Sequence, residues 1–140
     1  MANEKLTEEL LEELLSKPRI DEFVATEDLH NKSFSEYLNE LLKNKNLERK
    51  DVIHKTNINE THAYQMFSGE RGASRDKVLQ LAFAMQLSLK ECDRLLHTAG
   101  VSNLYCKNRR DAIIIFCLNN NYNVNETNDV LYEFSEDTLS

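Results

Sequence analysis

The chain has 140 residues, of which 41% are hydrophobic and 29% charged, with three glycines and one proline, a composition typical of an all-α protein with a single core. Its net charge of −7 argues against a nucleic-acid-binding protein unless the acidic residues lie outside the binding region. No apolar run approaches the roughly 20 residues that span a bilayer, and the acidic N-terminus does not resemble a secretory signal, so we expect a cytoplasmic protein with no membrane contact.

The charges are unevenly distributed along the chain. Residues 1–32 contain 9 acidic and 4 basic side chains. Residues 33–100 contain 9 acidic and 10 basic side chains, and residues 101–140 contain 6 acidic and 3 basic ones. The middle segment, with a net charge of +1, is therefore the least acidic and the one that permits DNA binding. We predict three parts: an N-terminal acidic helix and connector (1–32), a helix-turn-helix domain (33–100) and a C-terminal helical hairpin (101–140).

The first predicted helix lies in the N-terminal part. Thr7 is suited to cap the run TEELLEELL, and Glu8 and Glu9 occupy the first turn, where the helix dipole favours anions. Five leucines form one wide apolar stripe on this helix: Leu6, Leu10, Leu11, Leu14 and Leu15. Ser16, Lys17 and Pro18 end it, and residues 19–32 read as a connector.

Five helices are expected between residues 33 and 100. A capping box at Ser33 and Glu36 opens a helix over residues 33–45, whose apolar residues follow helical spacing. Two further helices, over 47–56 and 60–68, are separated by the short segment 57–59, and Gly69 suits the left-handed residue that ends a helix. The fourth helix begins after Ser74, and the fifth begins at a second capping box, Ser88 and Glu91, and ends before Gly100.

The C-terminal part resembles the segment before it when the sequence is shifted by 35 residues. Arg75 and Asp76 then align with Arg110 and Asp111, and seven apolar positions between 78 and 95 meet apolar residues between 113 and 130. We predict a repeated helical hairpin in which the second copy stacks on the first. The alternative is a chance likeness between two amphipathic helix pairs. The repeat also predicts that the apolar run at 113–116 is helical, although alone it looks like a strand.

The helix pair at 47–56 and 60–68 has the spacing of a helix-turn-helix. Residues 34–99, about half of the chain, resemble the λ-repressor-like, or XRE, family of DNA-binding domains. The resemblance rests on spaced apolar and glycine positions followed by Glu70-Arg71-Gly72: Leu47, Val52, Ile53, Asn57, Ile58, Ala63, Met66 and Gly69. It implies a bundle of five short helices in which helix 60–68 lies in the DNA major groove.

The resemblance also implies which residues contact DNA. Base or phosphate contacts fall on six residues: Arg49, Glu60, Thr61, Tyr64, Gln65 and Arg71. Gln pairs well with adenine, Arg with guanine or phosphate, and Thr with a phosphate or a thymine methyl. Four more cations are candidates for contacts with the DNA backbone: Lys45, Lys50, Lys55 and Arg75. A different interpretation makes these residues a solvated helix face, with Tyr64 at the edge of the core and Arg71 paired with Glu70.

Several positions depart from the family pattern. Arg49 stands where the family often has Gln, and Glu60 places a carboxylate beside phosphates unless it accepts a hydrogen bond from cytosine N4. Asn57 stands where the family often has Gly, and Asn tolerates the left-handed conformation better than most residues. The family prefers Ala where this chain has Ile53 and a branched aliphatic residue where it has Ala63. We predict that these two side chains meet and that the exchange conserves the volume of the core.

These observations lead to two functional hypotheses. The first is a transcription regulator that binds double-stranded DNA as a homodimer. The second is a helix-turn-helix fold used as a protein-interaction module, such as an antitoxin-like or anti-repressor partner, with the acidic flanks on a basic protein. We expect neither an enzyme nor a cofactor or metal, since the three cysteines have no CxxC spacing and the four histidines no HxxxH or HExxH pattern.

Overall fold

Seven α-helices make up the part of the chain that the computed structural model describes, residues 32–140, and this part contains no strand. The helices are α3 (Phe34–Asn44), α4 (Arg49–His54), α5 (Glu60–Ser68), α6 (Arg75–Ala84), α7 (Leu89–Thr98), α8 (Arg109–Asn119) and α9 (Val124–Glu133). The all-α prediction is confirmed for these residues. The predicted leucine-rich helix and most of segment 1–32 lie outside them.

Local side-chain caps set the helix boundaries. Ser33 and Glu36 form the expected reciprocal capping box at α3, because the Glu36 N–H donates to the serine hydroxyl and the Glu36 carboxylate accepts from the Ser33 N–H. Ser88 and Glu91 do the same at α7. Helices α4, α6 and α7 begin or end within two or three residues of their predicted bounds, and α5 matches its prediction. These caps satisfy N–H groups that the first turn of a helix leaves without partners.

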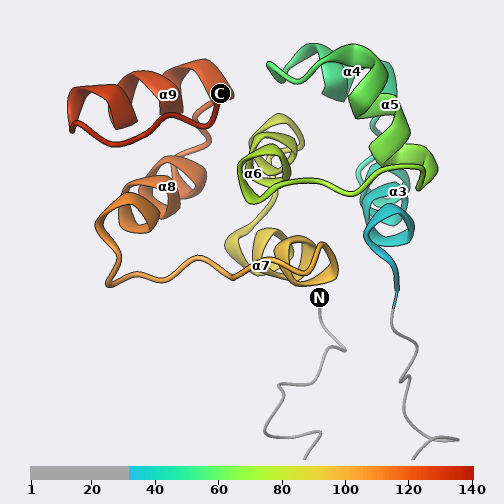
Figure 1. The fold of residues 1–140 in the computed structure, drawn as a ribbon, viewed down its shortest axis with the longest axis horizontal. Coiled ribbons are helices and arrows are strands. Elements are labelled where there is room, and N and C mark those ends of the chain that lie inside the picture. The colour runs from blue at the N-terminus through green and yellow to red at the C-terminus, as the bar shows by residue number, and fades with distance from the viewer. Residues whose placement is uncertain (1–31) are drawn as a thin grey trace, which may run out of the picture. The chain divides into compact units, whose positions relative to one another are not determined.

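Helix α6 occupies the centre of residues 32–140 (Figure 1). It contacts α4 on one side and α9 on the other, and it also packs against its hairpin partner α7, which in turn contacts α3. Seven consecutive residues of α6, from Val78 to Ala84, are buried, so helices cover it on every side. Residues 32–140 form one compact unit with one hydrophobic core, so the predicted segments 33–100 and 101–140 share that core.

The second hairpin repeats the first at the predicted offset of 35 residues. Helix α9 begins and ends 35 residues after α7, and α8 extends over the apolar run at 113–116, so the helical prediction there is confirmed. The turn between the helices repeats as well, because Gln86 and Asn121 both have a positive φ, 53° and 59°. The capping box of α7 recurs at α9, with Asn123 in place of serine and Glu126 as its partner.

Hydrogen bonds that close each hairpin also repeat at this offset. The N–H of Leu104 donates to Asp93 Oδ1 (3.0 Å), and the N–H of Leu139 donates to Asn128 Oδ1 (2.8 Å), although the two acceptors differ in residue type. The guanidinium of Arg75 donates to the carbonyl oxygens of Ser102 and Asn103. The guanidinium of Arg110 donates to the carbonyl oxygens 35 residues later, those of Asp137 and Thr138. Such agreement in three-dimensional contacts favours a true repeat over a chance likeness.

The two hairpins contact each other reciprocally. Arg75 of the first hairpin binds Asp111 of the second through two hydrogen bonds (2.9 and 2.8 Å), and Arg110 of the second binds Asp76 of the first (3.0 Å). Helices α6 and α9 are in contact, as are α7 and α8. Reciprocity of this kind is what an approximate twofold axis produces. An approximate twofold rotation therefore relates the two hairpins. In a solenoid, by contrast, each repeat would contact the next one through a different surface.

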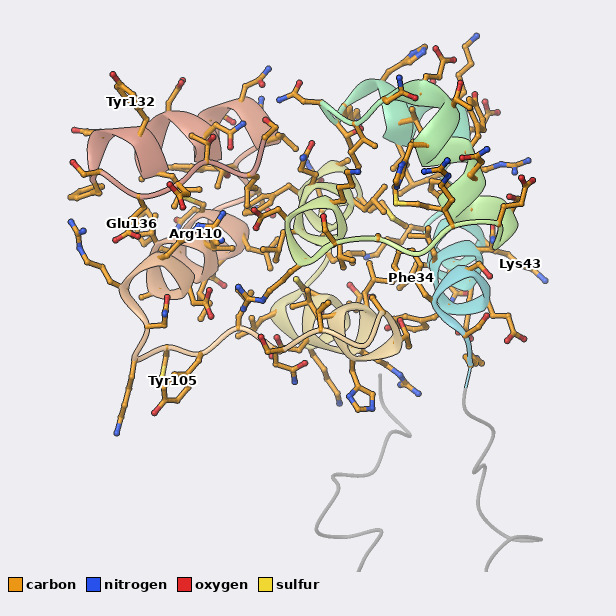
Figure 2. The ribbon with its side chains drawn as sticks, viewed as in Figure 1. Phe34, Lys43, Tyr105, Arg110, Tyr132 and Glu136 are labelled. Atoms are coloured by element: carbon orange, nitrogen blue, oxygen red, sulfur yellow. The ribbon has the colours of Figure 1, made fainter. Side chains whose placement is uncertain are left out.

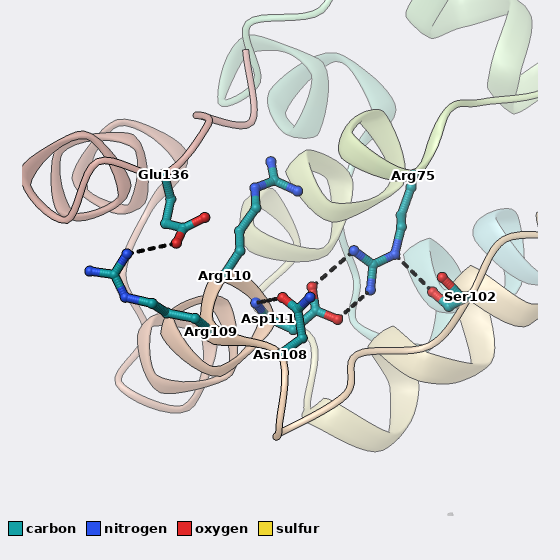
Figure 3. Close-up of a pocket in the computed structure, with 7 residues that line it drawn as sticks. All are labelled: Arg75, Ser102, Asn108, Arg109, Arg110, Asp111 and Glu136. Atoms are coloured by element: carbon teal, nitrogen blue, oxygen red, sulfur yellow. Dashed lines mark hydrogen bonds and ion pairs between the residues drawn. The ribbon is translucent and has the colours of Figure 1, made fainter.

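Asp111 is the most deeply buried carboxylate of this contact. In Figure 3 the guanidinium of Arg75 faces Asp111, while Arg109 turns away toward Glu136. Burial alone would raise the pKa of Asp111, but hydrogen bonds from Arg75 and from the backbone N–H of Tyr105 outweigh it and hold the pKa below its ordinary value. Asp111 is thus ionised in the folded protein and paired on both of its oxygens.

Candidate nucleic-acid interface

Helices α4 and α5 occupy the positions of the two helices predicted at 47–56 and 60–68. Val52 and Ile53 of α4 are buried, as are Ala63, Met66 and Phe67 of α5, and the two helices are in contact. Their inner faces therefore belong to the core. Ile58, between the helices, is also buried, in agreement with its place in the apolar pattern.

Hydrogen bonds to α6 and to the second hairpin hold the turn between the two helices. The backbone N–H of Asn57 donates to Gln80 Oε1 (2.8 Å), and the Gln80 amide donates to the carbonyl oxygen of Leu139 (3.0 Å). The Asn57 side chain donates to Asn125 and to the hydroxyl of Ser140. Asn57 is not among the described residues with a positive φ, so it does not use the left-handed conformation that its alignment with a family glycine had suggested. The turn is stabilised by tertiary contacts instead.

The two ends of α5 are well defined. Asn59 caps the first turn by accepting the N–H of His62 (3.1 Å). Gly69 ends the helix with a φ of 87°, and a Cβ at this position would lie 3.1 Å from Ser35 Oγ, so glycine is needed for both conformation and space. Asn39 of α3 donates to the carbonyl oxygen of Phe67 (2.8 Å) and fixes this end of α5 on α3.

The outer face of α5 carries four of the predicted DNA contacts. Glu60 and Thr61 are exposed, and Tyr64 and Gln65 are half-buried. The carbonyl oxygen of Gln65 accepts the N–H groups of Gly69, Glu70 and Arg71, so the following loop folds back over the end of the helix. The Gln65 side-chain amide makes no hydrogen bond within the described residues. It is therefore available to a ligand.

Arg49, at the start of α4, lies over the ring of Tyr64, with its guanidinium carbon 6.0 Å from the ring centroid. This distance is at the limit of a cation–π interaction. The structure thus brings together two predicted contact residues from the two helices. Tyr64 also packs against the core, so one side chain both supports α5 and orients Arg49.

The loop after α5 adds positive charge near its C-terminal end. Arg71 is exposed and makes no ion pair within residues 32–140, and the carboxylate of Glu70 accepts a hydrogen bond from Ser68. Burial, and then the charges of Lys77 and Arg71, lower the pKa of His62. Lys77 and Arg71 therefore both lie close enough to His62 to disfavour its protonated form. Sequence reasoning overlooked Lys77, whose only signal was its place in the first turn after Ser74.

The four cations expected at the DNA backbone fall into two groups. Lys50 and Lys55 are exposed on α4 and at its end. Lys45 pairs with Glu91 of α7 (3.1 Å), and Arg75 is bound by Asp111 and by two carbonyl oxygens, as described above. Arg75 therefore holds the hairpins together, and we leave it out of the interface proposed below. Lys45 would have to exchange Glu91 for a phosphate.

The exposed charges of this region are mixed in sign, with four basic residues (Arg49, Lys50, Lys55 and Arg71) and four acidic ones (Glu48, Asp51, Glu60 and Glu70). No group of three or more His, Cys, Asp or Glu residues within 32–140 is placed to hold a metal ion. None of the helices in that range is long and apolar enough to cross a bilayer. Comparisons with protein-family models, with curated proteins and with solved structures gave no significant match.

Proposed function

We propose that residues 33–100 form a λ-repressor-like DNA-binding domain and that the protein is a sequence-specific transcription regulator of XRE type acting in the cytoplasm. In this proposal α5 lies in the major groove of double-stranded DNA and α4 crosses the phosphate backbone. The supporting observation is the α4–turn–α5 unit, whose inner face is buried while Thr61, Gln65 and Arg71 remain accessible. The proposal assigns the protein neither an enzymatic activity nor a cofactor.

The chemistry of the accessible side chains suits a duplex. Gln65 can pair with both N6 and N7 of adenine, and Thr61 can contact a phosphate or a thymine methyl group. Arg49, Lys50, Lys55 and Arg71 supply positive charge around α5. Glu60 fits only if it accepts a hydrogen bond from cytosine N4, because elsewhere it would repel phosphates. Glu60 should therefore favour duplexes that place a cytosine opposite it and disfavour other sequences.

A selection from a pool of random-sequence duplexes tests this function directly. The full chain should enrich a near-palindromic site whose half-sites lie about one helical turn apart, roughly 34 Å, or a multiple of that distance. If no duplex is enriched and none binds at low salt, the DNA-binding proposal is wrong. The exposed face of α5 and the acidic flanks would then be candidates for contact with a basic protein.

Arg71→Ala should weaken binding to all duplexes and reduce the salt dependence of the affinity by about one phosphate contact. Arg71 is exposed and unpaired within the described residues, so its removal should leave the fold unchanged. Titration of labelled duplex at several salt concentrations measures the slope. Lys107→Ala is the matched control, because Lys107 is an exposed cation in the α7–α8 connection, away from α4 and α5 (Figure 1). An equal effect of both variants would mean that only net charge matters.

Gln65→Ala should cost about 1–3 kcal/mol of binding free energy on the selected duplex and relax the preference at one base pair. The reason is the loss of a bidentate contact with one base. Affinities for the selected duplex and its single-base variants give both quantities. Asn119→Ala, on the exposed end of α8, is the control and should change neither. An unaltered base preference in Gln65→Ala would remove Gln65 from base recognition.

A further inference from the structure

A polar pocket lies where the two hairpins meet, beside the first residues of α8 (Figure 3). Its volume is about 470 Å³, within the range of sites that bind small molecules. Its charged lining consists of three arginines and two carboxylates: Arg75, Arg109, Arg110, Asp111 and Glu136. Arg110 and Glu136 lie next to each other on this side of the second hairpin (Figure 2). The lining therefore has one more positive than negative charge.

Two of the three arginines hold the hairpins together. All three side-chain nitrogens of Arg75 donate hydrogen bonds, to Asp111 and to two carbonyl oxygens. Arg110 donates from Nε and Nη2 to Asp76 and to two carbonyl oxygens. Its Nη1 makes no hydrogen bond within the described residues. Arg110 therefore has donors left for a ligand, whereas Arg75 has none.

Arg109 is held much more loosely than the other two arginines. Its side chain is 63% exposed, and its one ion pair joins Nη1 to Oε2 of Glu136 (2.9 Å). Exposed ion pairs of this kind are weak, so another anion can replace the carboxylate. The repeat shows that the pair is not needed to pack a hairpin, because Ser74 and Val101 stand 35 residues before Arg109 and Glu136. The first hairpin forms the same helices without it.

The lining offers more hydrogen-bond donors than acceptors. Four nitrogens on residues of the pocket donate no hydrogen bond within residues 32–140: Nε and Nη2 of Arg109, Nη1 of Arg110 and Nδ2 of Asn108. Among the carboxylate oxygens, both of Asp111 accept hydrogen bonds, and Oε1 of Glu136 remains. A lining of this kind is complemented by a ligand with negative charge and several acceptor oxygens. A phosphate group has three such oxygens and between one and two charges, whereas a carboxylate has two oxygens and one charge.

We propose that this pocket binds a small molecule through its phosphate group, and that the phosphate replaces Glu136 as the partner of Arg109. The Nη1 of Arg110 and the side-chain amide of Asn108 donate to the remaining phosphate oxygens. Glu136 and the ligand therefore compete for one guanidinium. The inference goes beyond the proposed function and is independent of it, because none of these residues lies on α4 or α5.

Titration of the full chain with inorganic phosphate tests the site. Nitrogen–proton NMR spectra, recorded at neutral pH and at an ionic strength held constant with chloride, follow the side-chain Nε–H and the backbone N–H of Arg109. Their shifts should saturate with a Kd of about 1 mM or below, as expected for so small a ligand. Arg109→Ala should raise the Kd at least about 10-fold, because charge-assisted hydrogen bonds are lost. The absence of a saturable shift in the wild type overturns the proposal.

Lys107→Ala is the matched control for Arg109→Ala. It removes the same charge from an exposed residue two positions away that does not line the pocket, so the Kd should change by less than about twofold. Circular dichroism and the unfolding midpoint verify that both variants are folded. An equal loss of affinity in the two variants would mean that phosphate is attracted by net charge alone, which contradicts a site at Arg109.

Glu136→Gln tests the exchange itself, because a residue with a purely structural role would not improve binding when it is changed. Glutamine keeps the shape of the side chain but removes the competing charge, so phosphate should bind about 2- to 5-fold more tightly. Unchanged or weaker binding would contradict the exchange at Arg109. Acetate, titrated in the same way, should bind at least about 10-fold more weakly than phosphate. Equal affinities for the two anions would overturn the choice of a phosphate group.

Discussion

Asp111→Ala is expected to lower the free energy of unfolding by about 3–5 kcal/mol, the range found when a buried ion pair loses one partner. Asp111 accepts two hydrogen bonds from Arg75 and one from the backbone N–H of Tyr105 (3.0 Å), and its side chain is only 8% exposed. Alanine would leave the Arg75 guanidinium without its counter-ion between the hairpins. Urea denaturation followed by circular dichroism measures the loss. If the free energy of unfolding depends on urea concentration with the same slope as in the wild type, the unfolded state is unaffected.

The repeat supplies the control for this experiment. Asp76 is equivalent to Asp111, but its single hydrogen bond with Arg110 is 3.0 Å long and its side chain is 40% exposed. Asp76→Ala should therefore cost about 1 kcal/mol or less. A joint change of Arg75→Met and Asp111→Leu should recover much of the loss, because it leaves no unpaired charge. Equal losses at Asp76 and Asp111 would show that the buried position of the second pair is unimportant.

The pH dependence of the free energy of unfolding provides an independent test of the same ion pair. Since the pKa of Asp111 in the folded protein lies below its value in the unfolded chain, about 3.9, the pair stabilises the fold above that pH. The stabilisation is lost as the pH falls through the folded-state pKa. Asp111→Asn, which cannot ionise, should therefore show a shallower loss of stability between about pH 4 and 2. Parallel curves for the variant and the wild type would contradict the assigned pKa shift.

Ile53→Ala is expected to cost about 2–4 kcal/mol of folding free energy, because it leaves a cavity between α4 and α5. Ile53 is 3% exposed and Ala63 fully buried, on two helices that are in contact. Ala63→Ile alone should overpack the same space and cost about 1–3 kcal/mol. The double exchange restores the total volume and should recover much of the loss. Denaturation of all four proteins completes a double-mutant cycle, and strictly additive effects would show that the two side chains do not meet.

The helices and their boundaries could be predicted from the sequence because the responsible interactions are local. A capping box needs only two residues three positions apart, as at Ser33 and Glu36, and the left-handed end of a helix needs only Gly69. The repeat was predictable for a related reason. Each hairpin uses its own turn and caps, so similar apolar spacing at an offset of 35 residues produces similar local structure. This similarity identified 113–116 as helical.

The partners of individual charged and polar side chains could not be predicted in this way. From the sequence, Arg75 is expected to be an exposed cation. Its partner Asp111 lies 36 residues further on, so no local pattern reveals the ion pair. Asn57 suggested a left-handed turn, but its conformation is set by Gln80 and by the last residues of the chain. In the candidate interface, Thr61 and Arg71 are exposed as expected, whereas Lys45 is engaged by Glu91.

The sequence by itself determined the seven described helices, the capping boxes at Ser33 and Ser88 and the relation between the two hairpins. Only the tertiary structure decided how the hairpins meet, which charges are neutralised and which apolar side chains stay exposed. The physical reason is the distance along the chain over which each kind of interaction acts. Capping and helical periodicity act within a few residues, while ion pairing and apolar burial depend on which surfaces come together after folding. Phe116 and its buried counterpart Leu81 occupy matching positions on similar helices, and only their neighbours in space distinguish them.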